Sequence, residues 1–282
     1  MTLPIYNLDI GDRVKFGSYL IDIEKEEPQP IIWQIADKSH TGYPTDAITL
    51  VAEKIIDLRA FDAKEPTNSD SERKSYGNNR YKDSNIRQWL NNSEMNNWYV
   101  PQHSADASPT NGATDYNTGY DNMPGFLYFF TEQELSKILD TTLIVAKNTV
   151  TDGGGSETVT DKVFLLSNTE VGVINQNDIA EGSLLPLFND DASRMACLTQ
   201  QAFNNTKSSS KPSAIGDKWQ WLLRTPYTSN SSNVRFINAN GALQRDYACY
   251  GCDGIRPALN LSPETFVSDG IGYDGCYSVA DK

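Results

Sequence analysis

The C-terminal third of the chain contains three short apolar segments separated by turn-forming residues, and this pattern limits the fold more than any other feature. The segments are WQWLLRTP at 219–226, VRFINANGALQ at 234–244 and IRPALNL at 255–261. Short strands joined by polar turns, together with a few short helices, are typical of domains that keep helices and sheets apart. We therefore expect an α+β fold with short mixed or antiparallel sheets, two short helices and long loops.

Tryptophan and arginine side chains in this third are expected to form a rigid frame. Trp219, Trp221 and Leu223 alternate with other residues, which predicts that they share one face of a strand and lie in the core. Arg224 and Arg256 stand near the two ends of the region. We expect each to hold the frame by fixed hydrogen bonds to carboxylates or backbone carbonyls.

Turn and proline signals define the strands of this region further. The Asn240-Gly241 pair predicts a type I′ turn in a hairpin over 234–244, because both residues tolerate positive φ. Pro257 cannot donate a backbone hydrogen bond, so the strand at 255–261 is expected at a sheet edge or with a bulge.

The N-terminal part is expected to begin with β structure. Segments 31–37 and 47–61 are rich in β-branched residues and flank a turn at Gly42–Pro44, which predicts a hairpin with Trp33 and Ile35 packed against Leu50 and Ile55. Further strands are predicted over 143–150 and 161–167, with a flexible glycine turn at 152–156.

Two helices and one long loop complete the prediction. Ser84 is a candidate N-cap for a short helix with Ile86, Trp89 and Leu90 on its apolar face. The sequence Thr131–Glu134 predicts a capping box, with Leu135, Ile138 and Leu139 as the buried stripe. Residues 93–124 are polar and predict a long loop. We expect one domain over 1–282, with its core in about 31–261.

Composition excludes several classes of function. Asp and Glu outnumber Lys and Arg by 37 to 24, giving a net charge of -13, so nucleic-acid binding through a basic patch is not expected. No apolar run is long enough to span a membrane, and the N-terminal residues lack the basic and apolar regions of a secretory signal.

No motif identifies an enzyme. The only histidines are His40 and His103, and neither accompanies a nucleophile, phosphate-binding or zinc-protease motif. Cys249 and Cys252 form a CxxC without a second metal-binding pair, so free thiols are favoured over a disulfide or a zinc site. No cofactor is expected. Calcium is the alternative, with the carboxylates of Asp152, Glu157 and Asp161 as donors, although no EF-hand spacing occurs and a solvated acidic loop is favoured.

An ordered set of motifs carries a resemblance to a known family. SNIRQWLN (84–91), DKVFLLSNTEVG (161–172), WQWLLRTP (219–226) and GIRPALNL (254–261) occur in that order. This resembles a bacterial and phage domain family with a WWLR(S/T)P motif followed by GVRP, a branch of the C-type-lectin-like fold related to formylglycine-generating enzymes. The paired tryptophans are split here by Gln220. The calcium motifs of sugar-binding lectins are not evident, so calcium-dependent sugar binding is not carried over.

The resemblance implies a non-enzymatic, phage tail-associated receptor-binding protein, located in the virion or on an extracellular surface. Its implied partners are a host-surface protein or glycan and other tail proteins, with a homo-oligomer as a further option. In related folds a retroelement diversifies a C-terminal strand-and-loop segment, and the matching stretch here is Tyr227–Asp253. The candidate ligand-binding residues in it are Tyr227, Asn230, Ser232, Asn233, Phe236, Asn238, Arg245, Asp246, Tyr247, Cys249, Tyr250 and Cys252.

Two other functions stay open. One is a metal- or thiol-dependent enzyme of the formylglycine-generating type, although its paired cysteines would lie in the segment expected to vary. The other is a structural virion or surface decoration protein with no ligand at the C-terminal segment.

Overall fold

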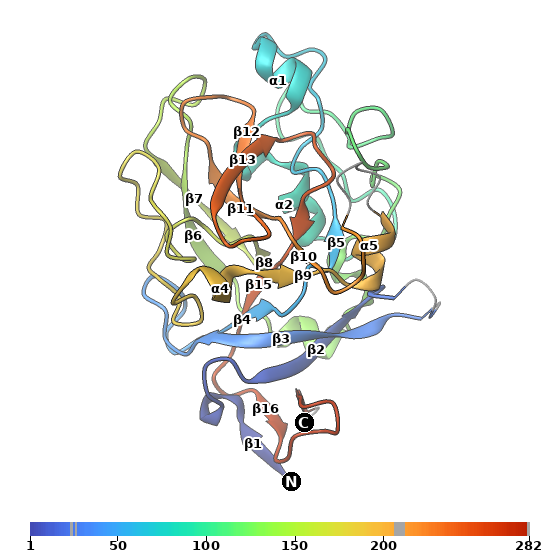
Figure 1. The fold of residues 1–282 in the computed structure, drawn as a ribbon, viewed down its shortest axis with the longest axis vertical. Helices are drawn as coiled ribbons and strands as arrows, with labels where there is room; N and C mark the ends of the chain where they lie inside the picture. Colours follow the sequence, from blue (N-terminus) through green and yellow to red (C-terminus); the bar gives the residue numbers. More distant parts are fainter. Residues whose placement is uncertain (23–24, 26, 206–211, 281–282) are drawn as a thin grey trace.

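Two main sheets organise the protein, as the computed structural model in Figure 1 shows for residues 1–22, 25, 27–205 and 212–280. The six-stranded sheet has the order β17-β2-β3-β4-β15-β8, and the five-stranded sheet has the order β13-β12-β11-β14-β5. Strands make up 29% of the residues and helices 14%, in several short sheets and few helices, so the fold is α+β as predicted. No helix in the described part of the chain is long and apolar enough to cross a membrane.

The strands of the two main sheets come from the whole length of the chain. Those of the six-stranded sheet are β2 (Arg13–Tyr19), β3 (Gln29–Asp37), β4 (Ile48–Ala52), β8 (Val163–Phe164), β15 (Ala258–Leu261) and β17 (Tyr277–Ser278). Those of the five-stranded sheet are β5 (Asp57–Leu58), β11 (Trp221–Pro226), β12 (Asn233–Ile237), β13 (Leu243–Tyr247) and β14 (Gly254–Ile255).

Three two-stranded sheets and five short α-helices surround them in the described part of the chain, so the predicted number of two helices is wrong. The small sheets pair β1 (Thr2–Pro4) with β16 (Phe266–Ser268), β6 (Thr141–Ala146) with β7 (Ser156–Asp161), and β9 (Ala196–Cys197) with β10 (Lys218–Trp219). The helices are α1 (Ser71–Tyr76), α2 (Asn85–Leu90), α3 (Glu132–Lys137), α4 (Asp191–Arg194) and α5 (Gln200–Asn205). Short 3-10 turns occupy Ile5–Asn7, Tyr81–Asp83 and Phe126–Phe129. In Figure 1, α1 and the paired strands β1 and β16 lie at opposite ends of the long axis.

The chain crosses between the main sheets at two adjacent places. After β4 it leaves the six-stranded sheet and continues as β5 in the other sheet, and after β14 it returns as β15. The predicted single strand over 47–61 is therefore wrong, because the backbone changes partners within it: Ile55 N–H donates to Cys197 and Ile56 N–H to Ile255. The predicted hairpin with β3 is formed, and Ile35 faces Leu50.

The proline at 257 marks the second crossing. β14 and β15 are separate strands, and β15 lies between β4 and β8 rather than at an edge, so the edge-strand prediction is wrong. Pro257 interrupts no backbone hydrogen bond of either strand because it lies between β14 and β15. Its carbonyl accepts from Ala52 N–H at 2.9 Å.

Both predicted helices form, and their caps are confirmed. The Ser84 side chain accepts from Arg87 N–H at the start of α2, whose apolar face buries Ile86, Trp89 and Leu90. α3 has the predicted capping box at Thr131. It ends at Lys137, so Ile138 is its C-cap and Leu139 lies beyond it. The predicted buried stripe is wrong, because no residue within α3 is buried and only Ile138 of the three is.

The other predicted strands form with shifted boundaries. The segment at 143–150 corresponds to β6, and 161–167 is divided between the end of β7 and β8. The glycine turn between β6 and β7 is confirmed, with positive φ at Gly153, Gly154 and Gly155.

The hairpin of β12 and β13 forms, but its turn is not the predicted one. Ile237 pairs with Leu243, which leaves residues 238–242 as the loop. Among the central residues only Gly241 has positive φ, whereas a type I′ turn requires it at both positions. Instead, the Asn238 side chain accepts from the backbone N–H groups of Asn240 and Ala242 and organises a longer loop.

Candidate functional site

Arg224 is a buried residue of β11 and holds the frame as predicted. Its guanidinium donates to both carboxylate oxygens of Glu170, at 2.6 and 2.7 Å, and to the carbonyls of Leu165 and Glu181 at 2.9 and 3.0 Å. Burial alone lowers the pKa of Arg224, but the Glu170 carboxylate outweighs this and the net pKa is raised. Arg224 therefore stays charged and links β11 to the segments around 165–181.

Arg256 performs the equivalent role at the second crossing. Its Nε donates to the Ala52 carbonyl at 2.9 Å and its Nη1 to the Arg194 carbonyl at 3.3 Å, and the guanidinium lies 5.1 Å from the Trp221 ring centroid. Burial lowers its pKa to about 10, which still leaves it charged at neutral pH. Both arginines of the predicted frame thus make the expected contacts.

The predicted tryptophan face is only partly formed. Trp219 belongs to β10 and is half-buried, whereas Trp221 begins β11 and is fully buried. Every residue of β11 is buried, so Leu222 is as inaccessible as Leu223, and the expected alternation does not distinguish two faces.

Strand alternation divides the β12–β13 hairpin into an outer and an inner side. The cross-strand pairs Asn233–Tyr247 and Arg235–Arg245 share one side, and the pair Val234–Asp246 shares the other. Val234 is buried and Asp246 half-buried, whereas Arg245 is exposed. The outer side therefore presents polar and aromatic groups, and the inner side faces the body of the protein.

A row of four tyrosine rings runs along one end of the outer side. Tyr76 stacks on Tyr247 with ring centroids 3.9 Å apart, Tyr247 meets Tyr250 edge-on at 5.3 Å, and Tyr250 meets Tyr116 edge-on at 4.6 Å. Backbone hydrogen bonds bring the rings together, since Cys249 N–H donates to the Tyr76 carbonyl and Asp115 N–H to the Cys249 carbonyl, both at 2.8 Å. The row is therefore built on fixed backbone.

Two arginines extend this row along the hairpin. The guanidinium of Arg245 lies 4.0 Å and that of Arg235 lies 4.6 Å from the ring centroid of Tyr227. Arg235 also donates to the Gln176 side chain at 2.8 Å. The tyrosine–arginine face consists of these side chains and the tyrosine row: Tyr76, Tyr116, Tyr227, Arg235, Arg245, Tyr247 and Tyr250.

One buried asparagine, Asn79, anchors the loop between β11 and β12. The Asn79 side-chain amide donates to three backbone carbonyls, those of Tyr227, Asn230 and Asn233, at 3.3, 2.7 and 2.9 Å. Its own carbonyl oxygen accepts from the Asn148 side chain at 2.9 Å. The loop is therefore anchored by its main chain.

Several predicted ligand-binding residues have structural roles. The Asn230 side chain accepts from the N–H groups of Ser232 and Asn233, and Ser232 is fully buried. Phe236 is buried on the inner side, and Asn238 organises the hairpin loop. Of the twelve residues predicted, the structure places Tyr227, Arg245, Tyr247 and Tyr250 in the tyrosine–arginine face, with half-buried Asn233 on the same side of the hairpin.

The two cysteines of the CxxC are free thiols inside the protein, not on its surface. Cys249 is fully buried, with its Sγ 3.6 Å from an Asp115 carboxylate oxygen, and Cys252 is 7% exposed. Burial raises the pKa of both thiols, and the neighbouring acids Asp115 and Asp253 raise it further. Neither thiol is therefore activated as a nucleophile.

An acidic and thiol cluster lies on the inner side of β13. One carboxylate oxygen each from Asp246 and Asp253 and the Sγ of Cys252 lie within 4.8 Å of one another. Asp253 is fully buried; burial raises its pKa well above the usual range, and Asp246 adds to this effect. We call this group the inner acid–thiol cluster.

A second cluster of potential metal ligands contains Glu65, His103 and Asp106, also within 4.8 Å of one another. His103 Nε2 lies 2.8 Å from a Glu65 oxygen, and Asp106 accepts from Gln102 N–H. Burial raises the pKa of Glu65, and His103 partly opposes this shift. The donor atoms of this second cluster therefore already have polar partners within the protein.

The other histidine has no catalytic geometry. His40 Nε2 lies 2.8 Å from the Ser183 carbonyl and 3.1 Å from the Ser183 hydroxyl. A carbonyl oxygen only accepts hydrogen bonds, so Nε2 carries the hydrogen and cannot take a proton from the hydroxyl. His40 is 4% exposed and packs against Tyr43, which is a core position.

The alternative calcium donors are separated by ion pairs. Asp152 is bound by Arg73 at 2.6 Å, Glu157 by Arg80 at 2.7 Å and Asp161 by Arg87 at 2.8 Å. Each carboxylate thus has its own guanidinium, and the three do not converge. The calcium site that these residues could have formed is absent from the described part of the chain, and so is the solvated acidic loop that the sequence favoured.

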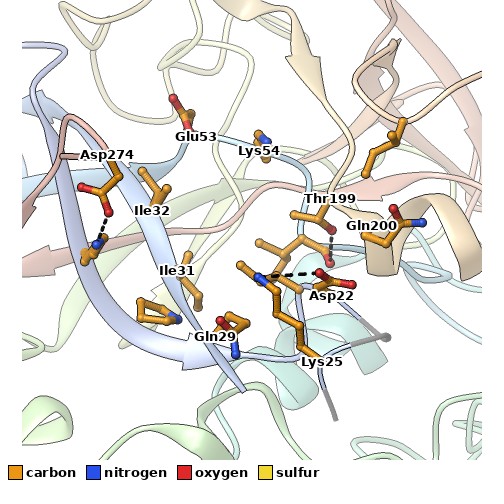
Figure 2. Close-up of a pocket in the computed structure, with 15 residues that line it drawn as sticks. Asp22, Lys25, Gln29, Ile31, Ile32, Glu53, Lys54, Thr199, Gln200 and Asp274 are labelled. Carbon is orange, nitrogen blue, oxygen red and sulfur yellow. Dashed lines mark hydrogen bonds and ion pairs between the residues drawn. The ribbon is translucent and has the colours of Figure 1, made fainter. Parts of the chain in front are cut away.

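A cavity of about 430 Å³ lies at another part of the surface, beside the β2–β3 hairpin. Figure 2 shows Lys25 directed toward Asp22, and Glu53, Thr199 and Asp274 around the same opening. Two of its acidic residues are paired with basic residues, since Lys15 bonds Asp274 and Arg13 bonds Glu53. The described lining residues include isoleucines and no nucleophile–base pair, and none belongs to 227–253.

Sequence reasoning missed the parts of the face that come from distant segments. Tyr76 ends α1, Tyr116 lies in the long loop over 93–124, and Asn79 precedes α2. Tyr116 was visible only as one aromatic residue among several in that loop. No local signal indicates that either tyrosine meets Tyr247 or Tyr250, because the contact arises from long-range backbone pairing.

Comparisons with known proteins give one match. The model of a family described as "Domain of unknown function (DUF6273)" matches residues 46–263. No curated protein and no solved structure matches the chain. The matched range includes the frame, the tyrosine–arginine face and both clusters of potential ligands, whereas β2 and β3 beside the cavity lie outside it.

Proposed function

The chain belongs to the DUF6273 family, and on that premise we propose that it is a non-enzymatic ligand-binding protein with a C-type-lectin-like fold. The tyrosine–arginine face is the proposed contact surface. A single observation carries this proposal: four tyrosine rings and two arginines gather on the outer side of an edge hairpin, partly exposed and held by fixed backbone.

The chemistry of this face suits recognition. Tyrosine supplies contact area at low cost in side-chain entropy, and its hydroxyl donates or accepts hydrogen bonds. Partial burial raises the pKa of Tyr250, and so does its hydrogen bond with Tyr116, which keeps this hydroxyl protonated at neutral pH. Exposed Arg245 adds a cation that could contact anionic or hydroxyl-rich groups.

We propose that the natural setting is a phage tail, in which the face contacts a receptor on the surface of a Gram-positive host and other surfaces contact tail proteins. The ordered motifs support this setting, together with a face built on a rigid frame. The receptor would be a protein or a glycan. Diversification by a retroelement would act on accessible positions such as exposed Arg245 and half-buried Tyr247, since Ser232 and Cys249 are buried.

The proposal is tested by adsorption to cells. Fluorescently labelled protein is mixed with a panel of Gram-positive bacteria, and bound fluorescence is measured by flow cytometry. The Tyr247→Ala/Tyr250→Ala variant is expected to lose binding, because it removes the two central rings of the row. Tyr6→Ala is the control, since Tyr6 is an exposed tyrosine that lies outside the face.

The same assay separates the candidate receptors. Protease treatment of the cells would abolish binding to a protein, and periodate treatment would abolish binding to a glycan. Unchanged adsorption of the double tyrosine variant would refute the contact assignment. If residues 227–253 were instead buried between subunits of an assembled particle, the alternative role as a structural decoration protein would replace it.

An enzyme of the formylglycine-generating type is less well supported. Such chemistry would require reactive thiols, and burial raises the pKa of both Cys249 and Cys252. Loss of a measured oxidase activity on Cys249→Ser substitution would favour it.

A further inference from the structure

The inner acid–thiol cluster contains a buried carboxyl oxygen that lacks a partner. Asp253 is fully buried, and its Oδ2 has no hydrogen-bond partner, whereas its Oδ1 accepts from the Gln220 side chain. A buried carboxylate oxygen without a donor is costly, because it has lost its hydration without compensation. Such an atom indicates that a further group belongs beside it.

No positive charge compensates this cluster. Among the described residues, no lysine, arginine or histidine forms an ion pair with Asp246 or Asp253. Arg245 is adjacent in sequence, but strand alternation places it on the outer side, over the Tyr227 ring. The two carboxyl groups and the thiol therefore lie close together, largely shielded from water, without a neighbouring positive charge.

We propose that Asp246, Cys252 and Asp253 bind a divalent transition metal ion, with zinc the best fit. Zinc accepts cysteine sulfur and aspartate oxygen together, whereas calcium and magnesium prefer oxygen donors alone. Ligands of a tetrahedral zinc ion lie roughly 3.5 Å apart, so atoms within 4.8 Å of one another need only a small closure.

The surroundings support the ligands in the way metal sites require. Gln220 holds one oxygen of Asp253 and so orients the carboxylate, and the Trp219 indole donates to the Cys252 carbonyl at 2.9 Å. Asp246 is half-buried and gives access from solvent. Three protein ligands leave a coordination position for water, and the ion would tie β13 to the segment that follows the CxxC.

The competing cluster at Glu65, His103 and Asp106 is the natural control. Its donor atoms are engaged by protein groups, and His103 pairs with Glu65 at 2.8 Å. Cys249 is a second control, because its Sγ lies beside Asp115 and is not among the three ligand atoms. This inference does not depend on the proposed binding function.

The test uses the full chain, stripped of metal with a chelator and then dialysed against zinc or cobalt. We expect about one zinc ion per chain by mass spectrometry, and a near-ultraviolet thiolate-to-cobalt absorption band. Cys252→Ser should abolish the band. Asp253→Asn should lower metal affinity by at least tenfold, because losing a direct ligand should cost at least as much as losing a residue that only orients a ligand. His103→Ala and Cys249→Ser should keep both stoichiometry and band.

Failure to bind zinc or cobalt in the unmodified chain would overturn the proposal. So would loss of the metal in His103→Ala or loss of the band in Cys249→Ser, because these outcomes assign the ion elsewhere. If Cys252→Ser or Asp253→Asn does not fold, the stoichiometry and cobalt spectrum of the unmodified chain, together with the two controls, still decide the question.

Discussion

Arginine occupies two contrasting settings in the C-terminal third of the chain. Arg224 belongs to β11, is 1% exposed, and forms a bidentate ion pair with Glu170. Arg245 lies on the outer side of β13 and rests on the Tyr227 ring in contact with solvent. The first position cannot change without leaving a buried charge, whereas the second loses only a surface contact. The arginine that stabilises the frame and the arginine of the proposed contact face thus lie on opposite sides of one sheet.

The largest expected effect comes from removing the buried arginine. Arg224→Ala should lower the free energy of unfolding by about 3–5 kcal/mol, because Glu170 would stay buried without its partner. Urea denaturation followed by circular dichroism measures the change. The paired variant Arg224→Met/Glu170→Leu should lose less, since no charge is left unpaired. A loss below about 1 kcal/mol for Arg224→Ala would contradict the contrast between the two sides.

The hairpin loop offers the next largest effect. A Cβ on Gly241 would lie 2.0 Å from the Asp191 carbonyl oxygen, and φ at this residue is +81°. Gly241→Ala should therefore destabilise the protein by about 2–3 kcal/mol. Gly153→Ala is the matched control, because φ is +76° but nothing lies within 4 Å of its Cβ position. Equal melting temperatures for the two variants would show that close packing of Gly241 against Asp191 in α4 does not limit the side chain at this position.

A pH dependence is expected from Glu181 in the frame. Burial raises its pKa, so the folded state holds a proton that the unfolded state releases above a pH of about 4.3. The contribution of Glu181 to the free energy of unfolding is fully present below that pH. It is lost as the pH rises through the raised pKa, by at most about 1.4 kcal/mol per pH unit.

Glu181→Gln removes that titration. The stability advantage of the unmodified chain over this variant should therefore shrink as the pH rises above about 4.3. Urea titrations at several pH values measure the difference. A constant difference across the range would mean that Glu181 has an ordinary pKa in the folded protein.

The smallest effect on stability is expected on the outer side. Tyr247→Ala should cost only about 1 kcal/mol, because the stacked and edge-on contacts with Tyr76 and Tyr250 are partly exposed. Tyr247→Phe keeps these contacts and should cost less. Thermal melts provide the comparison with Arg224→Ala, and a similar loss for both residues would make Tyr247 part of the frame.

Local signals predicted local structure well. The caps at Ser84 and Thr131 follow from hydrogen bonds within one helical turn, and both are present. The stapling roles of Arg224 and Arg256 were also predictable, because a buried guanidinium must find acceptors. The α+β class followed from the lengths and spacing of the apolar segments.

Long-range pairing accounts for the errors. The chain breaks the apolar run after Ala52 because the backbone of Ile55 and Ile56 is taken by the distant residues Cys197 and Ile255. Similarly, Cys249 was a candidate ligand-binding residue, yet it is fully buried where its backbone bonds to Tyr76 and Asp115. Sequence periodicity contains no information on such partners. The C-type-lectin-like fold and the receptor-binding role remain predictions.

The way Asn79 grips the loop at 227–233 has a practical consequence for protein engineering. Its side-chain NH2 group donates only to main-chain carbonyls of the loop, so these bonds do not depend on which side chains the loop residues carry. Exposed positions of the hairpin could then be randomised together in a combinatorial library while the scaffold keeps its shape. The protein would serve as a carrier for artificial affinity reagents, provided that Asn79 and the buried Ser232 are left unchanged.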